Sequence, residues 1–180
     1  EFILSKFIVV GTFALASTVF IFILSLILGY SFSSYNEIGI VFSDMEYLLA
    51  FFIKLVAFFS FCLFIGILVK RSAFALGFIF IWFIAENIFY WIAKFVILGG
   101  DDKHKNFGDT IIQYFPIESM SNLIKEPITR LNAIKTIEAT IGGAKVAKDY
   151  SIHFSQVSIV LVWTLIFIFA SYYIVKKRDL

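Results

Sequence analysis

The sequence has little charge and few of the residues that shape turns or form covalent links. Of its 180 residues only 16% are Asp, Glu, Lys or Arg, two are proline and one is cysteine. A soluble domain is about one-quarter charged, so this low share excludes an ordinary soluble fold, a coiled coil and a disordered chain. The single cysteine, Cys62, lies in an apolar run and cannot form an internal disulfide.

Charge balance and missing motifs narrow the function further. The net charge of +2 is too small to indicate a nucleic-acid-binding protein. There is no HExxH or paired CxxC motif, and His104 and His153 lack the carboxylate spacing typical of a metal site. The run ATIGGAK at 139–145 lacks the full phosphate-loop pattern. We therefore expect no nucleic acid, no metal, no cofactor and no enzymatic activity in this chain.

Long apolar runs take the place of these features. Hydrophobic residues make up 61% of the chain, 24 of them phenylalanine, and the mean hydropathy is +0.94. A helix needs roughly 20 apolar residues to cross a bilayer, and the runs long enough to do so are 7–28, 47–69, 73–98 and 157–175. Their apolarity is continuous, which favours helices over the alternating strands of a membrane barrel. The sequence predicts an all-α fold, a polytopic transmembrane helix bundle forming one domain over residues 1–180.

Basic residues at the ends of these spans predict the orientation. They cluster before the first span, between the second and third, and after the last: Lys6, Lys70, Arg71, Lys176, Lys177 and Arg178. The segment 29–46, between the first two spans, has no Lys or Arg. Cytoplasmic loops carry the excess of basic residues, so both ends of the chain are expected in the cytoplasm and 99–156 outside.

The outer segment 99–156 is expected to form a small helical extracytoplasmic loop. Apolar residues at helical spacing predict a short helix over 117–124, lying against the outer membrane face and capped by Glu118 or Ser119. A second amphipathic pattern covers 128–146 and is broken by two glycines.

Polar side chains inside the spans are the sharpest signal of a site, because ionisable groups in a bilayer are costly and usually paired or functional. Lys54 lies in the second span, and Glu86 and Asn87 lie near the middle of the third. A short turn makes these two spans antiparallel neighbours, so Lys54 and Glu86 are expected to face each other or a polar cavity. The pair has either a structural role, with Asn87 as a further polar contact, or a role as a proton or substrate relay.

The two ends of the chain carry a family resemblance. The opening EFILSKF, with Glu1, Phe2 and Lys6, is similar to the end of the pattern S-R-x-E-[FY]-x-x-x-K, and the closing KKRDL is a common ending in the same family. On these motifs and its topology, the chain resembles a permease subunit of an ATP-binding-cassette (ABC) transporter of the type-2 exporter class. Such permeases have six spans, of which these would be the last four.

The resemblance implies a function and partners that composition does not. It implies export of a substrate across the plasma membrane (the bacterial inner membrane), driven by a separate ATPase subunit that engages Glu1, Phe2 and Lys6. It also implies a second permease subunit, in a homodimer or heterodimer, within the lipid bilayer. The alternative is a non-transporting membrane scaffold, or an intramembrane enzyme in which Glu86 acts as acid or base.

Overall fold

The computed structural model describes residues 2–32, 45–69, 72–92, 112–124 and 151–178, and all regular structure in them is helical. The helices are α1 (Phe2–Phe32), α3 (Met45–Val69), α4 (Ser72–Ile92), α6 (Pro116–Leu123) and α8 (Phe154–Arg178). Four of these, α1, α3, α4 and α8, are long and apolar enough to cross a membrane. The predicted all-α polytopic bundle is therefore confirmed.

The helices differ in extent from the apolar runs that predicted them. Helix α1 begins at Phe2 and ends at Phe32, beyond both ends of the expected span 7–28. An apolar run indicates only the part of a helix that lipid surrounds. The helix itself can continue through polar flanking residues where no proline interrupts its hydrogen bonds. Helix α4 covers Ser72–Ile92 and so begins one residue before the expected span 73–98, whose residues 93–98 lie outside the described chain. The pattern at 128–146 and the basic pair Lys70–Arg71 also lie outside the described residues.

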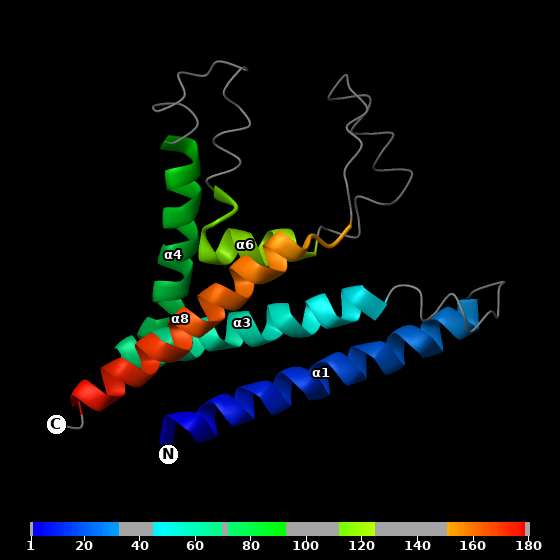
Figure 1. Ribbon diagram of the computed structural model, residues 1–180, viewed down its shortest axis with the longest axis horizontal. Coiled ribbons are helices and arrows are strands. Elements are labelled where there is room, and N and C mark those ends of the chain that lie inside the picture. The colour runs from blue at the N-terminus through cyan, green and yellow to red at the C-terminus, as the bar shows by residue number, and fades with distance from the viewer. Residues whose placement is uncertain (1, 33–44, 70–71, 93–111, 125–150, 179–180) are drawn as a thin grey trace.

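Helix α3 is the centre of the bundle. It contacts α1, α4, α6 and α8, and α1 also contacts α8. In Figure 1 the axes of α1, α3 and α8 are roughly aligned, with α1 running in the opposite direction to α3 and α8, while α4 points steeply away from all three. Both termini lie at the same end of this arrangement. The short helix α6 contacts α3, α4 and α8, and so lies where α4 departs from the other helices.

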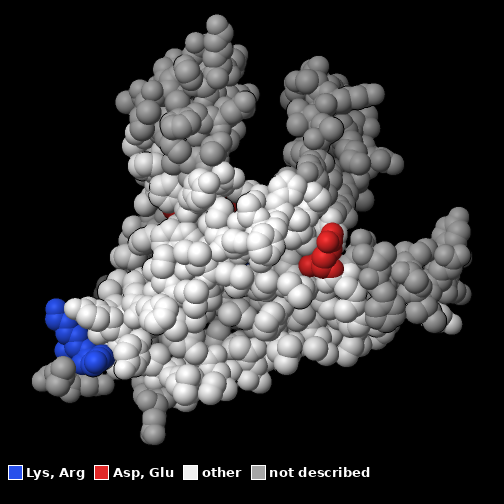
Figure 2. Space-filling view, viewed as in Figure 1, with Lys and Arg blue, Asp and Glu red and all other residues white. Residues whose placement is uncertain are grey.

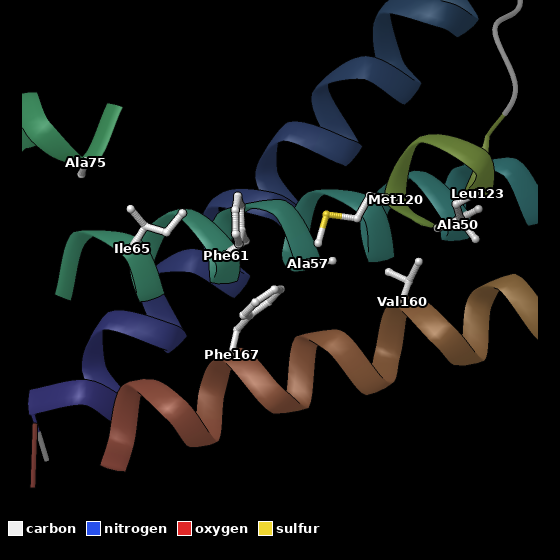
Figure 3. Packing of buried hydrophobic residues seen from close by; sticks show 9 residues of the cluster. All are labelled: Ala50, Ala57, Phe61, Ile65, Ala75, Met120, Leu123, Val160 and Phe167. Atoms are coloured by element: carbon white, nitrogen blue, oxygen red, sulfur yellow. The ribbon is translucent and has the colours of Figure 1, made fainter. Parts of the chain in front are cut away.

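The buried core lies mainly between α3, α6 and α8 and combines alanine, aliphatic and aromatic side chains (Figure 3). Phe61 of α3 is fully buried and packs against Phe167 of α8 with ring centroids 5.1 Å apart. It also meets Trp82 of α4 edge-on at 5.8 Å. Helix α1 joins through Phe13, whose ring meets Phe59 of α3 edge-on at 5.5 Å. Aromatic contacts of this kind contribute beyond their buried area, so Phe61 ties three helices together.

Helix α6 packs between α3, α4 and α8. Pro116, Ser119, Met120 and Leu123 are buried, and the last two belong to the same cluster as Ala50 of α3 (Figure 3). Ser121 of the same helix is exposed, so the helix buries one side only. Its expected place against the outer membrane face stays a prediction. Its apolar stripe faces protein, because α4 diverges from α3 and leaves a space that α6 fills.

Replacement of Phe61 by alanine should destabilise the protein strongly. Removing a buried phenylalanine leaves a cavity and typically costs about 3–5 kcal/mol, and Phe61 has no exposed surface. Phe58, on the same helix, is 40% exposed and gives a matched control. Thermal unfolding of the detergent-purified protein measures both variants. Equal losses for Phe61→Ala and Phe58→Ala would contradict the described packing.

Candidate functional site

The carboxylate of Glu86 is the centre of a polar site inside an otherwise apolar helix. Its Oε1 accepts a 2.6 Å hydrogen bond from Nε1 of Trp82, one turn earlier on α4. The same oxygen accepts from the backbone N–H of Ile117 at 3.3 Å, and Oε2 accepts from the backbone N–H of Glu118 at 3.2 Å. Three donors thus stabilise the half-buried carboxylate, which would be costly to bury without hydrogen bonds.

The two backbone donors belong to the first turn of α6. The first N–H groups of a helix have no partner within the helix and need acceptors from outside. Pro116, at the start of α6, has no N–H to satisfy, and the N-cap residue Phe115 gives no side-chain cap. Glu86 supplies the missing acceptors from another span. Its negative charge also interacts favourably with the N-terminal end of the helix dipole.

The expected caps are therefore wrong. Ser119 Oγ donates to the carbonyl of Pro116 at 2.9 Å, so it does not cap the helix start. The side chain of Glu118 accepts a 3.0 Å hydrogen bond from Nδ2 of Asn122, one turn further along. Both residues bond within α6, and the cap comes from α4.

A second hydrogen bond holds the turn that leads into α6. Nε1 of Trp163, on α8, donates to the carbonyl oxygen of Tyr114 at 2.7 Å. In the same turn, the ring of Phe115 packs against Phe89 of α4 at 5.0 Å. The start of α6 is therefore fastened to α4 on one side and to α8 on the other.

An aromatic row connects these two fastening points. Trp82 meets Phe61, Phe61 meets Phe167, and Phe167 stacks on Trp163 with centroids 5.6 Å apart. At one end of the row Trp82 donates its indole N–H to Glu86 of α4, and at the other end Trp163 donates its indole N–H to the turn before α6. We call Trp82, Phe61, Phe167 and Trp163 the aromatic row. It links α4, α3 and α8 beneath the first turn of α6.

These contacts place the start of α6 beside α4 and α8 at points away from the ends of those two helices. By helix rise, Glu86 lies about 9 Å from the last residue of α4, and Trp163 about 14 Å from the first residue of α8. Both residues bond directly to 114–118. Non-helical backbone at membrane depth is tolerated only where protein or a water-filled cavity surrounds it. The chain before α6 meets this condition through Glu86 and Trp163.

A cavity of about 410 Å³ opens beside Glu86, between α4, the turn at 112–115, α6 and the start of α8. Phe83, Tyr90 and Phe115 supply aromatic walls. Six lining residues are polar: Glu86, Asn87, Gln113, Glu118, Asn122 and Gln156. None of the described lining residues is Lys, Arg or His. The cavity can hold water or a polar group, and its charged side chains are both carboxylates.

The structure brings Glu86 and Asn87 to this cavity, as neighbours on α4. Nδ2 of Asn87 donates to the carbonyl of Phe83 at 2.9 Å. Lys54 is half-buried on α3 and does not line the cavity. Within the described residues, no ion pair joins Lys54 to Glu86. Their pairing stays a prediction.

The other predicted group lies at the opposite end of the molecule. Phe2 and Lys6 belong to the first two turns of α1, and the side chain of Lys6 is exposed. Glu1 lies outside the described residues.

Sequence reasoning missed the partners that give Glu86 its role. Trp82 stands one helical turn before it, so an i, i+4 pairing of an indole donor with a carboxylate was available as a signal. Nothing in the sequence marks the two backbone N–H groups of α6 as the other donors, because they lie more than 30 positions away.

A double-mutant cycle tests the Lys54–Glu86 pairing. Because Glu86 bonds to Trp82 and α6, the effects of Lys54→Met and Glu86→Gln on unfolding free energy should add to within about 0.5 kcal/mol, as for residues that share no contact. Thermal or denaturant unfolding of the single and double variants gives the coupling. A coupling well above about 1 kcal/mol would show that the two residues do pair in the assembled protein.

The comparisons with known proteins agree with this architecture. The family model described as ABC-2 family transporter protein matches residues 2–180, nearly the whole chain. No curated protein and no solved structure matches the sequence. With four apolar helices of membrane-spanning length in the described residues and a family match along their full extent, this chain belongs to the ABC-2 transporter family as a membrane component.

Proposed function

We propose that the chain is the membrane permease of an ATP-driven exporter whose energy comes from a separate ATPase subunit. The family match over residues 2–180 carries this proposal. The sequence contains no complete phosphate loop, which supports assigning ATP hydrolysis to a partner. The substrate crosses the plasma membrane, and this chain supplies the path and no chemistry.

The distribution of charge supports an orientation with both termini in the cytoplasm. Figure 2 shows Lys and Arg gathered at the end of α8, with an acidic side chain at the opposite end of the bundle. Lys6 of α1 lies near the N-terminus, which Figure 1 places at the same end as the C-terminus. Basic residues collect on the cytoplasmic side of membrane proteins. The end carrying α6 then faces outward.

The start of α1 suits contact with the ATPase. Phe2 and Lys6 are continuous with a helix of 31 residues, so a push on Glu1, Phe2 or Lys6 displaces the whole of α1. Helix α1 contacts α3 through the rings of Phe13 and Phe59, and α3 contacts every other described helix. Small movements at a rigid helix end are amplified when packed elements have few alternative arrangements.

A second permease subunit and lipid would cover the remaining apolar surface. Most side chains of α1 and α4 are exposed in the single chain: only 11% of the α1 span and 6% of the α4 span are buried. Gly11 of α1 has nothing within 4 Å of where a Cβ would lie, so its small size serves no contact within the described chain. A partner helix can approach α1 closely there.

The scaffold and intramembrane-enzyme alternatives gain no support from the site. Glu86 accepts two hydrogen bonds from the backbone of α6 and one from Trp82 of its own helix, and this is a structural use of the carboxylate.

The contact with the ATPase is tested by reversing the charge at the start of α1. In the full-length protein, Glu1→Lys should leave ATP hydrolysis by the complex in place but lower substrate transport at least about ten-fold, because a charged contact that transmits movement is lost. Glu46→Lys makes the same change at the opposite end of the bundle and should leave both activities intact. Transport by the purified permease without any ATPase would contradict the proposed function.

Orientation is tested by labelling single cysteines in intact cells with a membrane-impermeant maleimide, on a Cys62→Ala background. Glu46 and Lys177 are both exposed, at opposite ends of the bundle. Glu46→Cys should react from outside, whereas Lys177→Cys should react only after the membrane is permeabilised. The reverse pattern would overturn the orientation.

A further inference from the structure

The carboxylate of Glu86 and the first backbone N–H groups of α6 are hydrogen-bond partners. The strength of these hydrogen bonds depends on whether the Glu86 carboxyl is ionised. A carboxylate offers two oxygens as strong acceptors, and here three N–H groups use them. A protonated carboxyl keeps one good acceptor, turns the other oxygen into a hydroxyl and loses its charge. Hydrogen bonds to an ionised acceptor are roughly twice as strong as neutral ones, so protonation weakens the hold on α6.

One other negative charge of the described site lies near the start of α6, the Glu118 carboxylate of its own first turn, and that side chain accepts a hydrogen bond from Asn122 further along the helix. The other titratable groups lining the cavity are Glu118 of α6 and Tyr90 of α4, while α8 and the turn at 112–115 contribute the neutral Gln156 and Gln113. From α3, the neutral ring of Phe61 meets Trp82, and Lys54 is not among the lining residues. Among the described residues, the charged group that acts on Glu86 is the Glu118 carboxylate, which has the same sign.

Solvent can reach this group. Glu86 is half-buried, and the cavity that it lines is open at the protein surface. Helix α6 is short, and the chain before it is held by few bonds, chiefly those to Glu86 and the bond between Trp163 and Tyr114. Loss of the Glu86 bonds therefore removes the hydrogen bonds between α4 and α6, and leaves the ring contact of Phe115 with Phe89 and the hydrogen bond from Trp163.

We propose that Glu86 is a proton-sensitive latch: ionised, it keeps α6 docked between α4 and α8, and protonated, it releases the start of α6 and widens the adjacent cavity. Glu86 is thus a positioning residue for α6. The proposal rests on the proposed function only in placing this cavity on the outer side of an export path. Acid on that side shifts the population of α6 from docked to released.

The test measures how well α6 is protected as pH changes. Ser119 is 2% exposed on α6, while Ser121 is exposed on the same helix. On a Cys62→Ala background, Ser119→Cys and Ser121→Cys are labelled separately with a water-soluble maleimide in membranes containing the full-length protein. The ratio of the two rates cancels the pH dependence of the thiol. It should rise about ten-fold between about pH 8 and about pH 5, the range in which shifted carboxyl groups titrate, and fall again on return.

Three further variants separate the latch from other effects. Glu86→Gln should give a high ratio at every pH, because an amide offers one acceptor oxygen. Glu118→Gln changes a neighbouring carboxylate but not its backbone N–H, so the ratio should stay low at neutral pH. Ser60→Cys, at a fully buried position of α3, should stay unlabelled throughout, which distinguishes release of α6 from general unfolding.

Two results would overturn the proposal. One is a labelling ratio that does not change with pH while Glu86 is present. The other is the same pH-dependent rise in the Glu86→Gln background, which would assign the titration to another group. Neither measurement uses ATP or substrate, so failure of the latch leaves the exporter proposal standing, and failure of the exporter proposal leaves the latch standing.

Discussion

A carboxylate within an apolar helix needs hydrogen-bond donors, and the first turn of a helix away from water needs acceptors. In this protein the two requirements meet: Glu86 of α4 accepts from the backbone of Ile117 and Glu118 at the start of α6. Either group alone would be a costly unsatisfied polar element. Together they allow a short helix to sit inside the bundle, and the other contacts of α6 follow from that position.

The aromatic row connects this local arrangement to three membrane-spanning helices, α4, α3 and α8. Trp82 donates to Glu86 at one end, and Trp163 donates to the turn before α6 at the other. Between them, Phe61 and Phe167 are buried and in contact. If α4 moves relative to α8, either the ring contacts of the aromatic row or the packing of α6 must therefore change. This couples the separation of two spans to the state of the cavity beside Glu86.

Much of the architecture was predictable because it depends on local composition. A run of about 20 apolar residues can satisfy its backbone only as a helix in lipid, so span number and helix type follow from hydropathy alone. The isolated charges at Lys54 and Glu86 also stood out for the same reason. Their partners did not, because a carboxylate can take its donors from any element that comes within reach. The expected caps at Glu118 and Ser119 were wrong, since the acceptors came from α4.

What the sequence by itself determined is the class of the protein: four apolar helices with basic residues at one end, and a polar group inside the third. These features depend on the chemistry of neighbouring residues along the chain. Only the tertiary structure decided that α6 enters the bundle and that Glu86 caps it. Those contacts join α4 and α8 to the segment 112–124, which lies between them. They exist because α4 diverges from α3 and leaves a space with Glu86 on one side and Trp163 on the other, each of which needs a hydrogen-bond partner.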